Sequence, residues 1–371
     1  MSEGIEMDFY AVLHSAEAGE FLSVPEIALL LDAPDAAAEN ALFEAAYRVK
    51  SRICGKIVNL RGLIEFSNIC TRNCFYCGIR KSNLKVSRYT MSMEEILHSA
   101  ALAGKFGYGS VVLQSGERSD PAFVDFVEEL LLRISQLPYD LGITLSCGEE
   151  SLETYRRWKK AGARRYLLRI ESASEKIFKA IHPADALYSE RRAALERIKT
   201  AGFQTGSGVM IGLPGQTVAD LAADIDFFRS MDLDMIGMGP FIPQEDTPMG
   251  EKFPDQPGMP EKRLELSLRI IAVTRLVLRD VNIAATTALQ AIDPENGRER
   301  GILAGANVIM PNVGDIAHRK DYQLYNGKPS LDENSEDIRN KLIASLERIG
   351  ETARFNASGD PLHFFNRVQN K

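Results

Sequence analysis

Three cysteines stand close together in the first quarter of the chain, at Cys70, Cys74 and Cys77. Two more, Cys54 and Cys147, lie elsewhere in the sequence. An odd number of cysteines, most of them clustered, is not the pattern of a disulfide framework. Thiolates at this spacing are typical ligands of soft metals, and three of them can hold one face of a cubane 4Fe–4S cluster.

The number of ligands in this motif bears on its chemistry. Electron-transfer clusters of the 4Fe–4S type carry a fourth cysteine ligand, which the motif lacks. A missing protein ligand leaves one iron open to a small molecule, as three-ligand zinc sites keep a position for substrate. A zinc site is the alternative, but zinc prefers paired C-x-x-C units or histidines, and no histidine lies in the motif. We therefore expect an open cluster on these three cysteines, and we assign no role to Cys54 or Cys147.

The elements around the motif alternate between strands and helices. An apolar run from Leu63 predicts a strand directly before the cysteines. Seven further runs predict strands that begin near Ser110, Gly142, Arg165, Gln204, Met235, Asn282 and Asn307. Stretches of helical period separate them, which indicates parallel pairing with right-handed crossovers. Eight such units predict an α/β fold with a complete (β/α)8 TIM-type barrel, and an open doubly wound sheet is the alternative.

Extensions flank the predicted barrel on both sides. We expect a helical extension over residues 1–56, the barrel over 57–319, and a C-terminal segment over 320–371. The last of these contains a helix and a polar tail, and we expect it to close the barrel.

Polar residues gather where the predicted strands end. They include Glu65, Ser67, Asn68, Gln114, Ser115, Glu117, Ser146, Glu149, Arg169, Glu171, Thr286, Thr287 and Asn312. The carboxyl ends of all strands of a barrel meet at one mouth, which is where active sites form. Any one of these residues is explained by the start of a loop, but their recurrence predicts a shared site.

The composition excludes several classes of protein. The 371 residues carry 44 Lys and Arg against 51 Asp and Glu, a formal net charge of -7. We therefore expect no nucleic-acid partner, because binding to phosphates requires a basic surface. No apolar stretch approaches the roughly 20 residues that span a bilayer, so we expect no membrane partner. The acidic start lacks the pattern of a signal peptide, which predicts a cytoplasmic protein.

The pattern C-x-x-x-C-x-Tyr-C after a first strand resembles the radical SAM superfamily. Further segments resemble the FeFe-hydrogenase maturase HydE family, related to methylornithine synthase and biotin synthase. They cover about residues 57 to 328 and include VVLQSGE, RYLLRIESAS, GSGVMIGLPGQT, NIAATTAL, GANVIMPN and YQLYNGK. The resemblance implies one 4Fe–4S cluster that binds S-adenosylmethionine (SAM) and cleaves it reductively to a 5′-deoxyadenosyl radical. It also implies a role in assembling the FeFe-hydrogenase active-site cluster, through its dithiomethylamine bridge or an organometallic precursor.

The same resemblance implies roles for individual residues. Those expected to contact SAM are Tyr76, Ser146, Arg169, Glu171, Arg191 and Met210. Those expected to line a substrate cavity are Gln114, Arg165, Thr286, Thr287, Tyr322 and Tyr325. No acid or base is expected beyond the cluster and SAM. The expected substrate is small and cysteine-like or organometallic, such as a cysteine-bound iron–carbonyl–cyanide unit.

One departure from the family pattern concerns the number of clusters. Many members carry a second three-cysteine set after the YQLY segment, and residues 327–340 contain no cysteine. We therefore expect no second cluster. The expected partners are sister hydrogenase maturases and a one-electron reductant such as a flavodoxin or ferredoxin. Two alternatives stay open, namely an amino-acid mutase of the methylornithine synthase type and a non-catalytic iron–sulfur scaffold.

Overall fold

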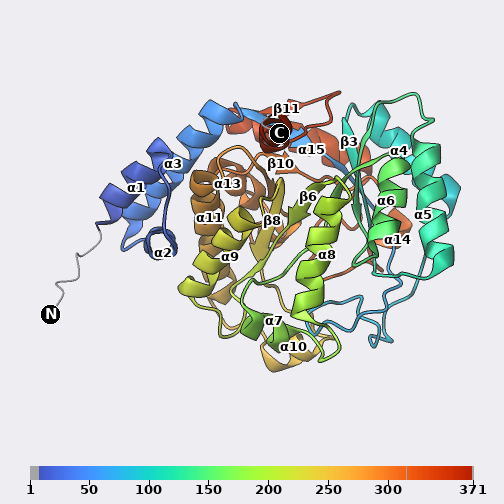
Figure 1. Cartoon of the computed structure of the whole chain (residues 1–371), viewed down its shortest axis with the longest axis horizontal. Helices are drawn as coiled ribbons and strands as arrows, with labels where there is room; N and C mark the ends of the chain where they lie inside the picture. The colour runs from blue at the N-terminus through green and yellow to red at the C-terminus, as the bar shows by residue number, and fades with distance from the viewer. Residues whose placement is uncertain (1–7, 315, 370–371) are drawn as a thin grey trace.

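The computed structural model describes residues 8–314 and 316–369, and a parallel sheet lies at their centre (Figure 1). Each of the eight runs predicted from sequence contains a strand, so those predictions are confirmed. The strands are β1 (Ile57–Leu60), β2 (Gly62–Ser67), β3 (Ser110–Ser115), β4 (Gly142–Ser146), β5 (Ala163–Leu167), β6 (Gln204–Ser207), β7 (Met210–Ile211), β8 (Met235–Pro240), β9 (Asn282–Ala285), β10 (Val308–Ile309) and β11 (Thr352–Arg354).

The sheet is an open, curled barrel, so the prediction of a complete barrel is wrong. Its order is β11-β1-β10-β9-β8-β6-β5-β4-β3-β2, and β7 pairs with β8 beside this path. Regular pairing stops after β10, because the chain soon reaches Pro311, which has no N–H to donate. Beyond that point, in the part of the chain that the structure describes, an isolated bridge joins Leu63 to Asn312. It has hydrogen bonds from the Leu63 N–H to the Pro311 carbonyl (2.8 Å) and from the Val313 N–H to the Leu63 carbonyl (3.0 Å).

Helices cover the outside of the curled sheet. They are α4 (Met93–Lys105), α5 (Pro121–Ile134), α6 (Leu152–Lys160), α7 (Glu175–Ile181), α8 (Tyr188–Thr200), α9 (Val218–Ser230), α10 (Pro248–Lys252), α11 (Met259–Val277), α12 (Thr287–Ile292), α13 (Gly297–Leu303) and α14 (Ile316–Arg319). The local sequence determines where some of these helices begin, since capping boxes at Ser92 and Thr217 start α4 and α9. The two capped helix starts fix the ends of the loops that follow β2 and β7.

The N-terminal helices α1 (Phe9–Ala18), α2 (Val24–Leu31) and α3 (Ala36–Ile53) lie to one side of the barrel, drawn in blue in Figure 1. They pack against α9 and α11. The apolar face of α3, with Leu42, Ala45 and Val49 fully buried, joins the main hydrophobic core. The extension therefore shares its core with the barrel.

The C-terminal part contains α15 (Ser335–Arg348), β11 and α16 (Leu362–Gln369). Residues 357–361, between the last two, cover the amino-terminal ends of the strands. The side-chain amide of Asn282, the first residue of β9, donates to the Gly359 carbonyl (2.8 Å). This cover lies at the end of the barrel opposite to the one where the strands finish.

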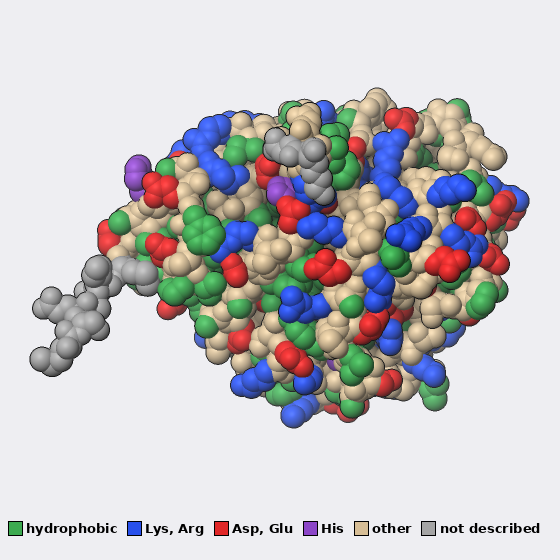
Figure 2. All heavy atoms as spheres, viewed as in Figure 1, with side chains coloured by type: hydrophobic (Ala, Val, Ile, Leu, Met, Phe, Trp, Pro, Cys, Tyr) green, Lys and Arg blue, Asp and Glu red, His purple; other side chains and the backbone are tan. Residues whose placement is uncertain are grey.

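The molecular surface shows no large region of a single charge on the face seen in Figure 2, where basic and acidic side chains alternate. Among the described residues, no helix is both long and apolar enough to cross a bilayer.

Candidate functional site

A cavity of about 220 Å³ opens at the carboxyl ends of the strands. Its lining contains most of the residues that the sequence singled out. They are Tyr76, Cys77, Gln114, Ser146, Arg169, Glu171, Met210, Thr286, Thr287 and Tyr325. The structure thus brings both expected groups, one for SAM and one for substrate, to a single space.

The cysteine motif forms a loop between β2 and α4 at the edge of this cavity. Its three thiols are half-buried, and the backbone N–H groups of Arg72 and Glu117 both point at Cys70 Sγ, at 3.4 Å. Burial raises the pKa of the Cys70 thiol and raises that of Cys74 to about 12, and Cys70 adds to the rise at Cys74. Raised pKa values mean that burial disfavours the charged thiolates. Bound iron stabilises thiolates, so the loop fits an iron–sulfur cluster.

The arrangement of donors distinguishes a cluster from a single ion. Among the residues that the structure describes, no three His, Cys, Asp or Glu side chains converge closely enough to hold one metal ion. A cubane does not require such convergence on one ion, because it takes each cysteine on a different iron. The other two cysteines lie apart: Cys147 is fully buried in the core, and Cys54 ends α3.

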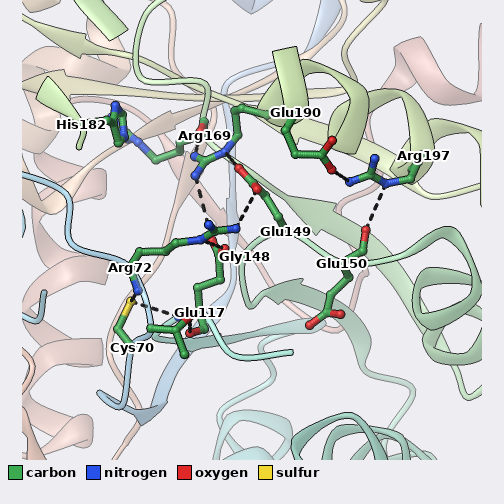
Figure 3. Close-up of polar contacts among 12 residues, drawn as sticks. Cys70, Arg72, Glu117, Gly148, Glu149, Glu150, Arg169, His182, Glu190 and Arg197 are labelled. Carbon is green, nitrogen blue, oxygen red and sulfur yellow. Dashed lines mark hydrogen bonds and ion pairs between the residues drawn. The ribbon is translucent and has the colours of Figure 1, made fainter. Parts of the chain in front are cut away.

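A network of ion pairs ties the cysteine loop to the ends of β3 and β4 (Figure 3). Arg72, from the loop, pairs with Glu117 after β3, and its Nη2 lies 2.9 Å from Glu149 Oε2 after β4. Arg191 of α8 binds the other oxygen of Glu149, Nε to Oε1 at 2.5 Å. The carboxylates are largely buried, so these pairs hold the loop and Arg191 in place more firmly than exposed pairs would.

Arg169 and Glu171 follow β5 and face each other in the cavity. Arg169 Nε lies 3.0 and 3.1 Å from the two carboxylate oxygens of Glu171. Glu171 has a φ of 65°, a left-handed conformation that residues other than glycine rarely adopt. Such strain is concentrated at functional sites, where the surrounding structure maintains it. Here the Gly208 carbonyl accepts the Glu171 N–H (3.0 Å), and Arg191 Nη1 donates to the Arg169 carbonyl (2.6 Å).

Tyr76 and Met210 form an apolar wall of the same space. Both pack against a small hydrophobic cluster made by Ile177, Ile181, Leu213, Phe241 and Met249. The Tyr76 ring meets His182 edge-on, with ring centroids 5.4 Å apart. Burial lowers the pKa of His182 to about 4, so this imidazole is neutral at pH 7. An aromatic ring held against an apolar wall suits a flat heterocycle.

The opposite wall carries hydroxyl groups. Thr287 Oγ1 lies 2.8 Å from the hydroxyl of Tyr325, and Thr286 Oγ1 donates to the Met238 carbonyl (3.1 Å). Tyr322 is fully buried just behind the lining, with its ring beneath Lys328. These residues come from β9, α12 and the segment after α14, so only the fold brings them together.

Arg165 is not at the cavity, and its expected place there is wrong. It is fully buried in the middle of β5, and its guanidinium pairs with Asp360 and donates to the Gln204 side chain (3.0 Å) and the Ser358 carbonyl (2.6 Å), all at the amino-terminal side of the barrel. Arg165 therefore holds the segment that covers the amino-terminal ends of the strands. Its carboxylate partner, Asp360, lies far away in the sequence, so no local pattern predicts the pair.

Three charged residues of the lining had no role assigned from sequence, namely Glu65, Arg298 and Lys328. Lys328 Nζ contacts both carboxylate oxygens of Glu65, at 2.6 and 2.5 Å, and the Tyr322 carbonyl at 3.0 Å. Glu65 was among the polar residues noted at the strand ends, and that position could have marked it as a cavity residue. Arg298 and Lys328 come from a helix and a loop, where no pattern marks them.

Known proteins resemble this chain in sequence and in fold. Residues 64–228 match the Radical SAM superfamily. The chain is 42% identical over 313 residues to the "[FeFe] hydrogenase maturase subunit HydE" of Thermotoga maritima, covering 84% of this chain and 86% of the relative. It is 26% identical over 337 residues to the 3-methylornithine synthase of Methanosarcina acetivorans, covering 89% of each.

Solved structures share the fold. Methylornithine synthase (PylB) superposes with a TM-score of 0.79 at 25% identity, over 93% of this chain and 98% of that one. The FeFe-hydrogenase maturase HydG from Carboxydothermus hydrogenoformans has a TM-score of 0.77 at 22% identity, over 94% of this chain and 79% of its own. The identity to HydE over most of both chains, with the cysteine loop beside the cavity, shows that this chain belongs to the radical SAM superfamily and, within it, to the [FeFe] hydrogenase maturase HydE family.

Proposed function

We propose that this protein is a radical SAM enzyme that acts in assembling the active-site cluster of FeFe-hydrogenase. The observation that carries the proposal is the meeting of the three-cysteine loop, the Arg169–Glu171 pair and the Thr287–Tyr325 pair around one cavity. The similarity to HydE supports the reaction class.

The cofactor side of the cavity has a residue suited to each part of SAM. Cys70, Cys74 and Cys77 would hold the cluster, which would supply the electron for reductive cleavage of SAM. Arg169 lines the cavity and suits the carboxylate of SAM, because guanidinium groups bind carboxylates in a bidentate manner. Arg191, which lies behind the lining and donates to the Arg169 carbonyl, is assigned to the same end of SAM. The remaining residues assigned to SAM are Glu171 for a ribose hydroxyl, Tyr76 and Met210 for the adenine, and Ser146 for the polar part of the ligand.

The substrate side suits a small polar ligand. Gln114, Thr286, Thr287 and Tyr325 line it with amide and hydroxyl groups, as a cysteine-like or organometallic substrate requires, and Tyr322 lies behind them, hydrogen-bonded to Gln114. Arg165 is left out, because its guanidinium is engaged at the other end of the strand. The protein orients both ligands and excludes water, so that a reactive species meets only the substrate.

The proposal includes partners and a location. A one-electron reductant such as a flavodoxin or ferredoxin supplies the cluster, and sister maturases deliver the substrate and take the product. A single cluster per chain is proposed, because residues 327–340 carry no cysteine. A cytoplasmic location remains part of the proposal.

Anaerobic reconstitution tests the proposal. We expect about four irons per chain, and formation of 5′-deoxyadenosine from SAM when dithionite reduces the cluster. An Arg191→Gln variant should keep its iron and bind SAM about 10- to 100-fold more weakly, as loss of a charged hydrogen-bond partner predicts. Activation of the hydrogenase with its sister maturases present completes the test.

Each alternative gives a different result in the same experiment. A content near eight irons, or stoichiometric zinc, contradicts a single open cluster. Bound iron without SAM cleavage indicates a scaffold, and SAM cleavage that rearranges an amino acid without activating hydrogenase indicates a mutase.

A further inference from the structure

The cavity lining has more positively than negatively charged side chains. Its lining contains five charged side chains: Glu65, Arg169, Glu171, Arg298 and Lys328. Arg169 pairs with Glu171, and Lys328 pairs with Glu65. No hydrogen bond or ion pair joins Arg298 to any residue in the described part of the chain. The cavity therefore carries one positive charge that the protein does not balance.

Arg298 lies near the start of α13, between two adjoining cavities. It lines the main cavity and also a small adjoining pocket of about 20 Å³, and both hollows share Thr287 and Lys328. The same small pocket is lined by Gln290, whose Oε1 is buried without a hydrogen-bond partner among the described residues. An unpaired hydrogen-bond acceptor thus borders the same small pocket as the Arg298 guanidinium.

An unpaired guanidinium in this position is costly unless a ligand binds it. Burial lowers the pKa of Arg298, while Glu299 and Glu333 counter this only from a distance. An arginine does not lose its proton in a protein, so the charge remains and favours an anion. The planar fork of a guanidinium matches a carboxylate, which it binds through two parallel hydrogen bonds.

We propose that Arg298 binds the carboxylate of an amino-acid-derived substrate. This inference rests on the proposed function and names the group that anchors the substrate. The position fits that role, because Thr287 and the hydroxyl of Tyr325 lie next to it on the substrate wall. Arg169 does not line the small pocket, so the carboxylates of SAM and of substrate have separate arginines.

The experiment compares two forms of one probe in the reconstituted protein with SAM bound. The probes are a synthetic cysteine-bound iron–carbonyl–cyanide complex and the same complex made with cysteine methyl ester, which lacks the carboxylate. Dissociation constants come from anaerobic titration calorimetry, and SAM affinity and uncoupled SAM cleavage are measured in parallel. The variants are Arg298→Met and Arg298→Lys. Arg300→Met serves as control, because Arg300 lies on the same helix and pairs with Glu265 outside the cavity.

The native protein should bind the acid at least about 10-fold more tightly than the ester. Arg298→Met should weaken acid binding by about 10- to 100-fold and leave ester binding, SAM affinity and uncoupled cleavage unchanged. Arg298→Lys should recover part of the preference, and Arg300→Met should behave as the native protein.

Three results overturn the inference. Retained preference for the acid in Arg298→Met shows that another group binds the carboxylate. Equal loss of acid and ester shows that Arg298 contacts a different part of the ligand, and a change in SAM affinity places it on the cofactor side. If the native protein cleaves SAM but binds neither probe, the proposed substrate class fails together with this inference. If it does not cleave SAM, the proposed function itself fails.

Discussion

Two kinds of cysteine lie at the carboxyl ends of the strands. Cys74 and its two neighbours in the motif sit on a loop that reaches the cavity, with backbone N–H groups directed at Cys70. Cys147 follows β4 and is fully buried, with Sγ 3.9 Å from the Leu113 carbonyl. Burial raises the pKa of Cys147 to about 12, so it remains a thiol that fills space in the core.

This difference predicts the behaviour of two alanine variants. Cys74→Ala leaves two thiolates in the motif, which are too few to hold the cluster, so iron content and SAM cleavage should both be lost. Cys147→Ala should keep about four irons and native cleavage, with a stability loss of about 1–2 kcal/mol from the smaller side chain. Iron analysis and electron paramagnetic resonance of the reduced proteins measure both effects. Cluster loss in Cys147→Ala would show that a ligand has been misassigned.

At the scale of elements, residues 320–328 form a covering segment over the cysteine loop and the cavity. The Leu324 carbonyl accepts the Gly78 N–H (3.0 Å), and the Asn68 side chain donates to the Asp321 carbonyl (2.7 Å). The Lys328–Glu65 pair, both residues being less than a tenth exposed, attaches the end of the segment to β2. This buried pair therefore helps to hold the segment over the cavity.

Removing one member of the pair should detach the covering segment. Lys328→Met leaves Glu65 with a buried, uncompensated charge, which costs about 3–5 kcal/mol. We expect faster proteolysis within residues 320–334 and more SAM cleaved per product formed, because the cavity admits water. A Glu65→Gln/Lys328→Met double variant removes both charges and should recover most of the protease resistance. Equal sensitivity of the single and double variants would show that the charge pair does not hold the segment.

At the scale of the whole molecule, the C-terminal helix α16 joins loops that precede strands on the covered side of the barrel. His363 lies between Asp232 and Asp280, with ring nitrogens 2.7 and 3.0 Å from their carboxylates. Arg367 Nη2 lies 2.8 Å from the buried Asp234. The hydrogen bond to Asp280 raises the pKa of His363 above its ordinary value, and the bond to Asp232 adds to this.

The raised pKa gives stability a defined pH dependence. Because the folded protein holds the proton more tightly, the stabilisation is complete below the unfolded pKa near 6.5 and disappears as pH rises through the higher folded value. His363→Gln should therefore lower the free energy of unfolding by about 1–2 kcal/mol at pH 5.5 and by much less at pH 9. Urea unfolding at both values measures the difference. A penalty that does not change with pH would show that His363 contributes by packing alone.

The sequence alone predicted eight strand-bearing runs, the helices between them and the cysteine loop, but neither β1 nor β11. Apolar runs with β-branched residues are local, and so is the C-x-x-x-C-x-x-C spacing. The rule that strand ends meet at one mouth also placed Ser146, Glu171 and Thr286 at the cavity, because parallel strands share a direction. These features need no knowledge of distant contacts.

Only the tertiary structure decided how the charges pair and where the barrel stops. Arg165 was expected at the cavity, but Asp360, almost two hundred residues away, binds it at the other end of the barrel. Arg298 and Lys328 reach the cavity from a helix and a loop that no periodicity links to the strands. The barrel stays open because regular pairing stops after β10, close to Pro311, and β2 is joined to this part of the chain by the bridge between Leu63 and Asn312. Local patterns record which face of an element is buried, whereas the partner of a buried charge depends on contacts between segments far apart in the chain.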